Sequence, residues 1–486
     1  MQKLYEYEKA VSPEKRTELG IVYTPPEIVS FINESVLSLW DKDHPPKFID
    51  PCCGTGVFLM DMAQKVSERY NIPVDIVYRD YAFGIDLDGE AISVALSAMP
   101  HANLYNRDSL NEDLSEYDVI ITNPPYIRIQ NLDELVRKDL KDNFEFCKGD
   151  TDLYMAFLEK IAKTNKISGM IFPNSWLKNK NADNARSFVS CSGRASTLID
   201  FRSKKVFDNA STYTNILILS DREVENIKVG NNLDSLTVVE TSQVFVGDLV
   251  VTSIDDMKYA KEVATREHRF LDVVDIKTGL ATLADDVFCL ELVSKGQKYS
   301  SVKKRGKKHK EVFQIENDML APCIRAGDIT KNLTKKYVMI FPYKNQKPIP
   351  TQHIRTKFPE LYNFLEKNKE RLLQRDKGKD KGYNWTEFGR TQALGLKNKD
   401  KIVFSTMVSD KMSLKDSAPG TVFVSGYCFM PKSNLLDGQA LRRVLASDDL
   451  LRWVKIFGKD FGNEWRGISK QTFKNYKINL DNLINT

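Results

Sequence analysis

The 486-residue sequence lacks the features that mark a membrane or secreted protein. It has no uninterrupted apolar run of about 18 residues, the length that a membrane-spanning helix needs. Its polar beginning, MQKLYEYEKAVSPEK, has no apolar core of the kind found in secretory signals. We therefore expect a cytoplasmic protein that does not act at a membrane.

Cysteine and histidine are also scarce. Seven cysteines are scattered along the chain, two of them adjacent at Cys52-Cys53, and there are five histidines. An odd number of cysteines without paired spacing argues for a reducing compartment and against a disulfide scaffold. No Cys-x-x-Cys pair or histidine cluster has the spacing of a zinc site, so we expect no metal.

The net charge of +5 is small, but it is unevenly distributed. Residues 1–240 contain 27 Lys and Arg against 37 Asp and Glu, whereas residues 241–486 contain 44 against 29. An acidic half joined to a basic half suggests that one part works on a small ligand and the other faces a polyanion. We expect two domains, 1–240 and 241–486.

Before about residue 222, strand-like segments alternate with amphipathic helical segments. This pattern predicts an α/β fold with a mostly parallel seven-stranded sheet, helices on both faces, and ligands at the carboxyl ends of the strands. Beyond 222 the regularity fades: 221–237 is typical of a linker or hairpin region, and the second half of a mixed α+β domain. The seven expected strands lie at 46–51, 81–88, 102–110, 118–125, 167–177, 196–202 and 213–220.

A glycine-containing turn, FIDPCCGTGVFL, follows the first of these strands. Gly54 and Gly56 let the backbone approach a ligand closely, and the next helix offers free amides at its N-terminus. The turn lacks the third glycine of a dinucleotide fingerprint and the Lys-Ser/Thr of a phosphate loop. It indicates either an adenosine-type cofactor or simply a tight strand–helix turn.

Three acidic residues end three successive strands. Asp50 ends the first, Asp86 follows the second in GID, and Asp108 follows the third in RDS. An acid after the second strand is placed to accept hydrogen bonds from ribose hydroxyls, and one after the third could accept an adenine amine. Each acid alone would be an ordinary loop residue, but the set favours a cofactor site.

The fourth strand stops abruptly in VIITNPPYIR. Pro124 and Pro125 remove two backbone donors, so the strand ends there. The Asn123 side-chain carbonyl and the Pro124 carbonyl present two acceptors to one amino group, and Tyr126 offers a flat face to a planar ring. This arrangement suits an aromatic or amide NH₂ that attacks an electrophilic methyl group. The plainer interpretation is a turn closed by an aromatic ring.

Together these motifs resemble those of the gamma-class adenine-N6 DNA methyltransferases of restriction–modification systems. In that family a TPP segment precedes the glycine turn, and the NPPY turn and a C-terminal target-recognition domain follow. GIVYTPPEIVSFI (20–32, here the TPP segment), GDTDLYMAFLEKI (149–161) and GMIFPNSWL (169–177) are similar to its motifs. KVFDNASTYTNILIL (205–219) resembles the motif whose phenylalanine packs a flipped base against the NPPY tyrosine, which places that role on Phe207.

The resemblance implies a Rossmann-like methyltransferase domain that binds S-adenosylmethionine, and a target adenine that flips out of the duplex. Tyr126 and Phe207 would stack on that base, while Asn123 and the adjoining prolines would hold its amino group. Asp86 would hold the ribose and Asp108 the cofactor's adenine. The implied cofactor-binding residues are Tyr23, Thr24, Pro25, Asp50, Pro51, Gly54, Gly56, Asp86, Asp108 and Asn123.

The basic half is weakly similar to the family's specificity domain at 276–288, 322–332, 385–390 and 462–478. We expect it to bind double-stranded DNA with a short specific sequence, although the basic run KKRGKKHK could equally be a solvated loop. The candidate DNA contacts are Lys303, Lys304, Arg305, Lys307, Lys308 and Lys310 in that run, with Arg325, Arg390 and Arg466 beyond it.

Residues 1–19 leave no room for a nuclease before the TPP segment, so we expect a separately encoded partner endonuclease. Because both modules lie on one chain, we expect a monomer. Three alternatives stay open: methylation of a protein glutamine amide, a non-catalytic DNA-binding subunit that holds the cofactor, and cytosine-N4 methylation. Enzymes of the last kind usually begin the turn with serine.

Overall fold

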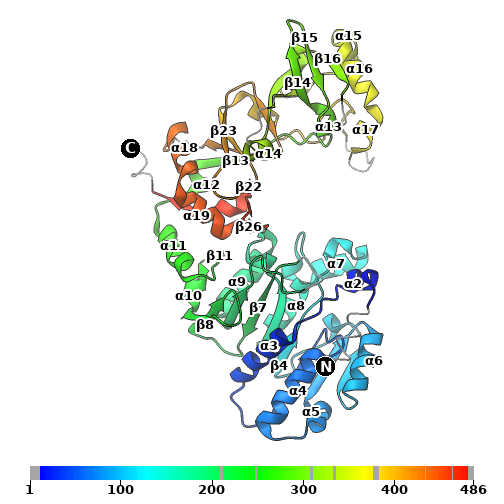
Figure 1. Cartoon of the computed structure of the whole chain (residues 1–486), viewed down its shortest axis with the longest axis vertical. Helices are drawn as coiled ribbons and strands as arrows, with labels where there is room; N and C mark the ends of the chain where they lie inside the picture. Colours follow the sequence, from blue (N-terminus) through cyan, green and yellow to red (C-terminus); the bar gives the residue numbers. More distant parts are fainter. Residues whose placement is uncertain are drawn as a thin grey trace. The chain divides into compact units, whose positions relative to one another are not determined.

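The structure is a computed structural model that describes residues 11–207, 212–246, 249–306, 310–331, 335–375, 382–432, 434–461 and 464–479. The chain divides into two compact units, Met1–Glu262 and Val263–Thr486 (Figure 1). The division falls later than the boundary expected at 240, and α10 (Thr241–Val244) belongs to the first unit, where it packs against the last strand of the sheet. Within the described ranges, no helix is long and apolar enough to cross a membrane.

A single sheet forms the centre of the first unit, with the strand order β3-β2-β1-β4-β5-β7-β6-β8-β9. The strands β3, β2, β1, β4 and β5 run parallel to one another, whereas β7 lies antiparallel between β5 and β6. The strands are β1 (Phe48–Asp50), β2 (Ala82–Asp86), β3 (Asn103–Asn106), β4 (Val119–Thr122), β5 (Ile167–Pro173), β6 (Ala195–Asp200), β7 (Thr214–Leu219), β8 (Asn226–Gly230) and β9 (Thr237–Glu240).

The seven expected strands are present, but the described sheet extends to nine. Strands β8 and β9 form a hairpin from the stretch interpreted as a linker or hairpin region, and β8 pairs in parallel with β6. In β8 only Ile227 and Val229 are buried, between exposed or half-buried neighbours. Two buried positions are a weak period-two signal, which explains why the sequence did not separate this strand from a linker.

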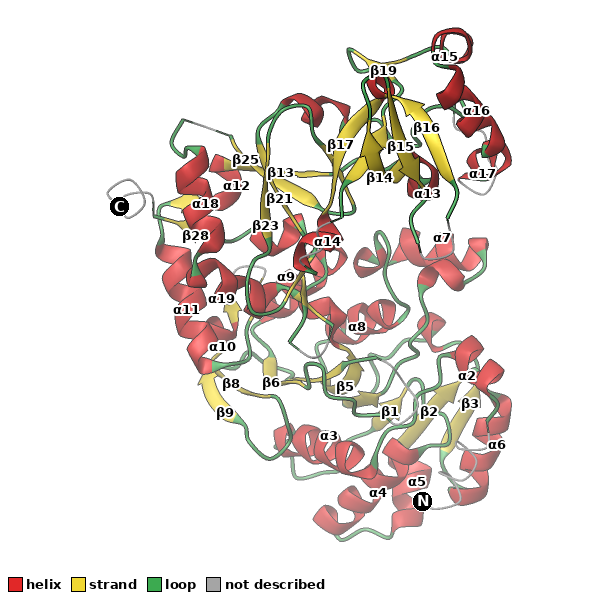
Figure 2. Cartoon of the chain, turned by 45° about the horizontal axis from the view of Figure 1, so that its top comes forward, coloured by secondary structure: helices red, strands yellow, loops and turns green. Residues whose placement is uncertain are grey.

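Helices cover both faces of this sheet. Helices α3 and α4 pack against each other and against the sheet, whereas α8 packs with α9 and β5 (Figure 2). Helix α3 begins at Pro26, and Ile28, Val29, Ile32 and Val36 form its buried stripe. The unit's helices are α2 (Pro13–Leu19), α3 (Pro26–Leu39), α4 (Val57–Tyr70), α5 (Val74–Tyr81), α6 (Gly89–Ala98), α7 (Glu134–Asn143), α8 (Tyr154–Lys163), α9 (Asp183–Ser192), α10 and α11 (Ile254–Thr265), which ends just past the boundary.

The second unit is mixed α+β, as expected. Its larger sheet has the order β16-β15-β14-β18-β17-β24 and its smaller sheet the order β13-β25-β21-β23. Their strands are β13 (Val274–Thr278), β14 (Cys289–Lys295), β15 (Tyr299–Lys303), β16 (Val312–Glu316), β17 (Leu320–Arg325), β18 (Tyr337–Ile340), β21 (Lys401–Phe404), β23 (Leu414–Ser417), β24 (Val422–Val424) and β25 (Tyr427–Pro431).

Helices and short strands complete this unit around its own aromatic core, which includes Phe288, Phe364 and Phe388. Helix α16 lies on β16, and α18 packs against α19 and β25. The helices are α12 (Phe270–Val273), α13 (Asp285–Phe288), α14 (Ala326–Thr330), α15 (Thr351–Lys357), α16 (Pro359–Lys367), α17 (Lys369–Leu373), α18 (Gly438–Ala446) and α19 (Asp448–Phe457). The short strands are β12 (His268–Arg269), β19 (Tyr343–Lys344), β20 (Lys347–Pro348), β22 (Met407–Val408), β26 (Lys459–Asp460), β27 (Arg466–Gly467) and β28 (Lys477–Ile478).

Candidate active site

The glycine turn and the NPPY turn lie side by side at one edge of the first unit's sheet. They follow β1 and β4, which are paired in parallel, so both turns leave the carboxyl ends of neighbouring strands. The buried Asp50 carboxylate, at the end of β1, accepts the Cys52 N–H at 2.9 Å.

Both glycines of the turn adopt left-handed backbone conformations, with φ of 50° at Gly54 and 83° at Gly56. They serve different purposes. A side chain at Gly56 would press on the flexible end of Met99, which can move aside, so the φ of 83° is what favours glycine there. A side chain at Gly54 would meet nothing within 4 Å, so the backbone there borders open space and can approach a ligand.

Asp86 fastens the end of β2 to the glycine turn. Its carboxylate accepts the Gly54 N–H at 2.7 Å and the Asp88 N–H at 2.8 Å. Burial raises the pKa of Asp86, and burial also raises the pKa of Asp50 to about 7. A carboxylate has about four acceptor positions, so both acids retain capacity for further donors such as hydroxyl groups, which would offset the cost of burial.

Asp108 follows β3, which is the strand next to β2 in the sheet. It is exposed, and it caps the short 3₁₀ segment Ser109–Asn111 by accepting the Leu110 N–H at 3.0 Å. The Ser109 hydroxyl donates to the Pro51 carbonyl at 2.5 Å and holds this loop against the glycine turn. The three acids predicted to line the site therefore follow three adjacent strands, and the sequence analysis missed the linking Ser109.

The Asn123 amide is held in one orientation. Its Nδ2 donates to the Val22 carbonyl at 3.1 Å and to the Thr24 hydroxyl at 2.9 Å. Its Oδ1 is buried and has no hydrogen-bond partner. Both amide donors are therefore used within the chain, and the acceptor oxygen is left for a ligand.

The TPP segment docks on the NPPY turn through its backbone as well. The Tyr126 N–H donates to the Gly20 carbonyl at 3.3 Å. Gly20 has φ of 64°, and a side chain there would come within 2.8 Å of the Tyr126 nitrogen. Thr24 is buried in this contact, while Tyr23 and Pro25 are half-buried beside it. Gly20 and Val22 lay in a recognised motif, but the sequence gave no reason to single them out.

Tyr126 and Phe207 are brought together, as the resemblance implied. Their ring centroids are 6.2 Å apart and their planes are inclined by 59°. Phe207 is 4% exposed, and the Tyr126 hydroxyl donates to the Ile171 carbonyl at 3.4 Å. Burial, followed by the nearby Tyr154, raises the pKa of Tyr126. Because the two rings pack on each other at a steep angle, a planar base would fit between them only after they separate.

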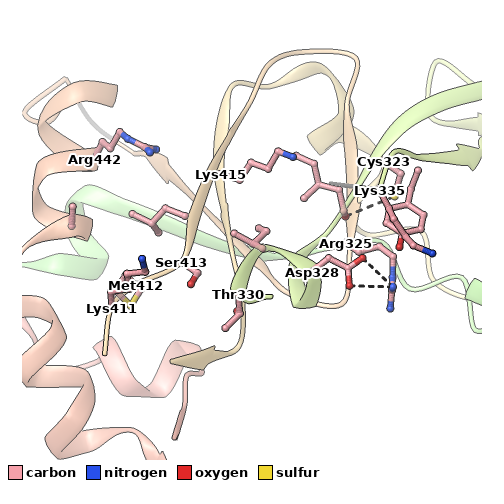
Figure 3. Close-up of a pocket in the computed structure, with 15 residues that line it drawn as sticks. Cys323, Arg325, Asp328, Thr330, Lys335, Lys411, Met412, Ser413, Lys415 and Arg442 are labelled. Atoms are coloured by element: carbon pink, nitrogen blue, oxygen red, sulfur yellow. Dashed lines mark hydrogen bonds and ion pairs between the residues drawn. The ribbon is translucent and has the colours of Figure 1, made fainter. Parts of the chain in front are cut away.

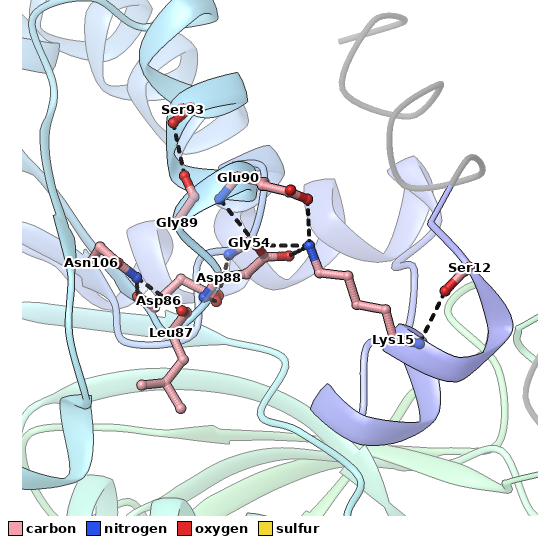
Figure 4. A network of polar contacts seen from close by, with 10 residues as sticks. All are labelled: Ser12, Lys15, Gly54, Asp86, Leu87, Asp88, Gly89, Glu90, Ser93 and Asn106. Carbon is pink, nitrogen blue, oxygen red and sulfur yellow. Dashed lines mark hydrogen bonds and ion pairs between the residues drawn. The ribbon is translucent and has the colours of Figure 1, made fainter.

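A network of ion pairs that the sequence analysis missed borders this site (Figure 4). The Lys15 ammonium lies 2.9 Å from Asp88 Oδ2 and 2.7 Å from Glu90 Oε2. Ser12 caps the helix α2 that carries Lys15, and Asp88 caps α6. Helix α2 is thereby fastened to the loop that follows Asp86.

Three of the described cations that were predicted to contact DNA from the basic run bond within the second unit. Lys303 pairs with Glu291 at 3.6 Å, Lys304 donates to Asn368, and Arg305 donates to the Asp285 carbonyl at 3.1 Å. Lys310 is exposed, whereas Lys307 and Lys308 lie outside the described residues.

The three arginines predicted beyond the run each bond within their own unit. Arg466 pairs with Asp460 at 2.9 Å, and Arg390 donates to the Gly389 carbonyl at 3.0 Å. Arg325 differs, because it pairs with Asp328 and also lines a cavity. Four other cations that the sequence analysis missed line the same cavity: Lys335, Lys411, Lys415 and Arg442.

Comparisons with known proteins agree with the motifs. Residues 95–207 match the family described as Eco57I restriction-modification methylase. The Type II methyltransferase M.HincII of Haemophilus influenzae is 29% identical over 238 residues, which are 47% of this chain and 43% of the relative. The chain thus spans less than half the length of the first curated relatives it matches. The Type II methyltransferase M.BstVI of Geobacillus stearothermophilus is 22% identical and covers 92% of this chain and 87% of its own.

Among the solved structures, a DNA-bound enzyme matches nearly the whole chain. It is described as the Type IIL restriction-modification enzyme MmeI in complex with DNA, and it covers 95% of this chain and 68% of its own with a TM-score of 0.62 at 12% identity. That likeness concerns the fold. The first unit has the Rossmann-like methyltransferase fold that the sequence predicted, and the chain is a relative of the restriction–modification methylases.

Proposed function

We propose that the chain is a DNA methyltransferase that moves a methyl group from S-adenosylmethionine to N6 of a flipped adenine in double-stranded DNA. Its role would be that of the modification enzyme in a restriction–modification or related defence system. The observation that carries the proposal is the state of the Asn123 amide, which shares the NPPY turn with Pro124 and Tyr126. Both of its N–H groups are occupied, and its buried oxygen has no hydrogen-bond partner.

The residues at the strand ends fit S-adenosylmethionine. The open space at Gly54 accommodates a ligand against the backbone, and Asp86 offers acceptors for ribose hydroxyls. Asp108 is exposed at the next strand end and can accept an amine, while Tyr23, Thr24 and Pro25 would cover the site. When bound, S-adenosylmethionine supplies an electrophilic methyl group. The same site would include Asp50, Pro51 and Gly56, which hold the turn in shape.

The chemistry assigned to the NPPY turn is positioning. Asn123 Oδ1 and the Pro124 carbonyl each accept one hydrogen of the adenine amino group. These two hydrogen bonds draw the nitrogen lone pair out of conjugation with the ring and aim it at the methyl donor. No strong base is needed, because the proton leaves after transfer. Orientation of this kind can supply about 7–11 kcal/mol of the barrier reduction.

Capture of the flipped base falls to Tyr126 and Phe207. Stacking on an aromatic side chain is worth roughly 1–3 kcal/mol per base, comparable to the few kcal/mol that unstacking a base costs. Because the two rings pack on each other at 59°, the base would displace that contact when it enters. Loss of either ring should therefore weaken capture of DNA more than the transfer step.

The second unit supports DNA as the substrate over a protein glutamine. A glutamine methyltransferase would need only the first unit, whereas M.BstVI is similar along 92% of this chain, second unit included. The names of the relatives M.HincII and RM.Eco57I also point to restriction–modification. Asn123 at the start of the turn favours adenine over cytosine. We further propose a monomer with a separately encoded endonuclease as partner.

Methylome sequencing of a methylation-free bacterial host that expresses the chain tests this proposal. We expect N6-methyladenine at one position of a fixed short motif, and none in cells that carry the empty vector. Unmodified adenine in cells with confirmed expression would contradict the proposal. Methyl groups on protein glutamine or on cytosine N4 would support one of the alternatives instead.

A further inference from the structure

The second unit contains a basic cavity of about 600 Å³. Strand β17, helix α14, strand β23 and helix α18 contribute to its lining. Figure 3 shows Arg325 and Asp328 toward one end of the cavity and Lys411 and Arg442 toward the other. Five of its lining residues are Lys or Arg, and Asp328 is its acidic residue within the described part of the chain.

The cations of this cavity are not equivalent. Lys335 pairs with Glu291 at 3.0 Å and Arg442 with Asp416 at 2.6 Å, so their charges are largely balanced. Lys411 and Lys415 are exposed, and neither forms an ion pair with a carboxylate among the residues that the structure describes. The uncompensated positive charge of the cavity therefore lies on Lys411 and Lys415.

Arg325 is held from two sides. Its NH1 lies 3.1 Å from Asp328 Oδ2, and its guanidinium carbon lies 5.5 Å from the centre of the Tyr337 ring. The Arg325 side chain is 27% exposed and that of Asp328 14%, so the pair is mostly shielded from solvent. A guanidinium fixed in this way has a defined direction, and the adjacent carboxylate cancels most of its charge.

Two polar atoms on this side of the cavity are buried without a partner. They are Nε of Arg325 and Oγ1 of Thr330. Both hydrogen bonds that Arg325 donates to the Asp328 carboxylate come from NH1, so its guanidinium keeps N–H groups for a further acceptor. Buried polar groups normally have partners, and unsatisfied ones that border a cavity point to a ligand rich in acceptors.

We propose that Arg325 recognises a guanine of the DNA target by donating two hydrogen bonds to its O6 and N7 atoms. Asp328 and Tyr337 are its positioning residues, and Lys411 and Lys415 contact neighbouring phosphates. This inference rests on the proposed function as a DNA methyltransferase. Asp328 decides between base and phosphate for Arg325, since a carboxylate 3.1 Å from the guanidinium would repel a phosphate but not the uncharged edge of guanine.

The test uses the full chain with S-adenosylmethionine and a pool of duplexes in which every position of the motif is varied. The variants are Arg325→Ala, Arg325→Lys, the double change Lys411→Ala with Lys415→Ala, and Arg371→Ala. Arg371 is the matched control, because it pairs with Asp286 at 2.9 Å in the same unit but does not line the cavity. Melting temperatures check that each variant folds.

We expect Arg325→Ala to lose roughly ten- to a hundredfold of the preference for guanine at one motif position while other positions keep theirs. Arg325→Lys keeps the charge but not the paired donors, so it should not restore that preference. The double lysine change should weaken binding to all duplexes alike and lower the slope of log affinity against log salt by about 0.9 for each lost phosphate contact. Arg371→Ala should match the wild type.

An unchanged preference at every motif position in a folded Arg325→Ala protein would overturn the proposal. So would a cavity that serves a small anion: inorganic phosphate would then raise the melting temperature of the wild type but not of the double lysine variant, with DNA binding unaltered in both. If the wild type methylates no DNA at all, the failure lies in the proposed function, and the inference fails with it.

Discussion

The glycine and NPPY turns of the first unit (here the strand-end corner) and the cavity of the second unit place their charged groups in opposite environments. In the corner, Asp50 and Asp86 are largely buried, receive backbone N–H groups, and have raised pKa values. In the cavity, Lys411 and Lys415 are exposed. Buried groups act through the direction of their hydrogen bonds, and their protonation depends on pH. Exposed charges act over longer distances and are screened by salt. If the proposed function holds, one chain separates the placement of the reacting atoms from the attraction of DNA.

The change Asn123→Ala should have the largest effect, and it should affect the first unit's site alone. It removes the oriented acceptor without touching any charge, so kcat should fall roughly 10²- to 10³-fold, the size seen when one preorganised hydrogen bond is lost. DNA affinity and its salt dependence should stay close to those of the wild type. Single-turnover methyl transfer and a binding titration measure the two quantities.

The matched control is Asn143→Ala, because that asparagine bonds Asp139 on the surface of α7. A rate for Asn123→Ala equal to that of the Asn143 variant would mean that the amide takes no part in the reaction.

The pH response of the corner depends on Asp50. Its pKa of about 7 in the folded chain lies above the ordinary value of 3.8, so the folded state binds a proton more tightly than the unfolded one. This contribution to stability is fully present below the unfolded pKa and is lost as pH rises toward 7. Asp50→Asn cannot ionise, so its stability relative to the wild type should rise by about 2 to 3 kcal/mol between about pH 5 and about pH 8.

Melting temperatures of both proteins at the two pH values test this sign. Glu27→Gln, a change at an exposed residue, provides the comparison. Parallel pH profiles for the wild type and the Asp50 variant would show that this carboxyl ionises in the folded state as it does in water.

Two substitutions at Tyr126 distinguish the role of its ring from that of its hydroxyl group. The hydroxyl contact to Ile171 is long, at 3.4 Å, so Tyr126→Phe should change little. Tyr126→Ala loses the stacking face and should weaken capture of the target base by roughly 1–3 kcal/mol. Fluorescence of a base analogue at the target position reports flipping, and equal signals from the two variants would leave the ring without a role in capture.

Lys15 should give the smallest effect. Its ion pairs with Asp88 and Glu90 are partly exposed, so Lys15→Met should cost no more than about 1 kcal/mol of cofactor affinity. Added salt should shrink the difference from the wild type. Titration calorimetry with S-adenosylmethionine at low and high salt measures it, and a large effect that persists in salt would mean that α2 contacts the cofactor directly.

The first unit was largely predictable because its signals are local. Strand ends at Asp50 and Thr122 are marked by glycine and proline, whose backbone preferences hold in any context. The orientation of the Asn123 amide was not predictable, since it depends on the carbonyl of Val22, about a hundred residues away along the chain. The angle between the Tyr126 and Phe207 rings depends likewise on packing that no short motif encodes.

The second unit was less predictable for the same reason. The run KKRGKKHK is conspicuous in the sequence, yet three of its described members, Lys303, Lys304 and Arg305, bond inside the unit. Arg325, Lys411 and Lys415 are isolated in the sequence and line one cavity only because the fold brings β17, α14 and the start of β23 together. Clustering in space is a tertiary property, and charge density along the chain is a poor guide to it.

The contacts of Gly20, Val22 and Thr24 with the NPPY turn predict what would happen if the residues before 26 were removed. A chain that began at residue 26 would retain every strand of the sheet, but the Asn123 amide would lose both acceptors that hold its Nδ2. The freed amide could then rotate by half a turn and offer donors where the substrate also carries donors. Residues 20–25, which lie outside the sheet, therefore set the amide orientation that the proposed role of Asn123 requires.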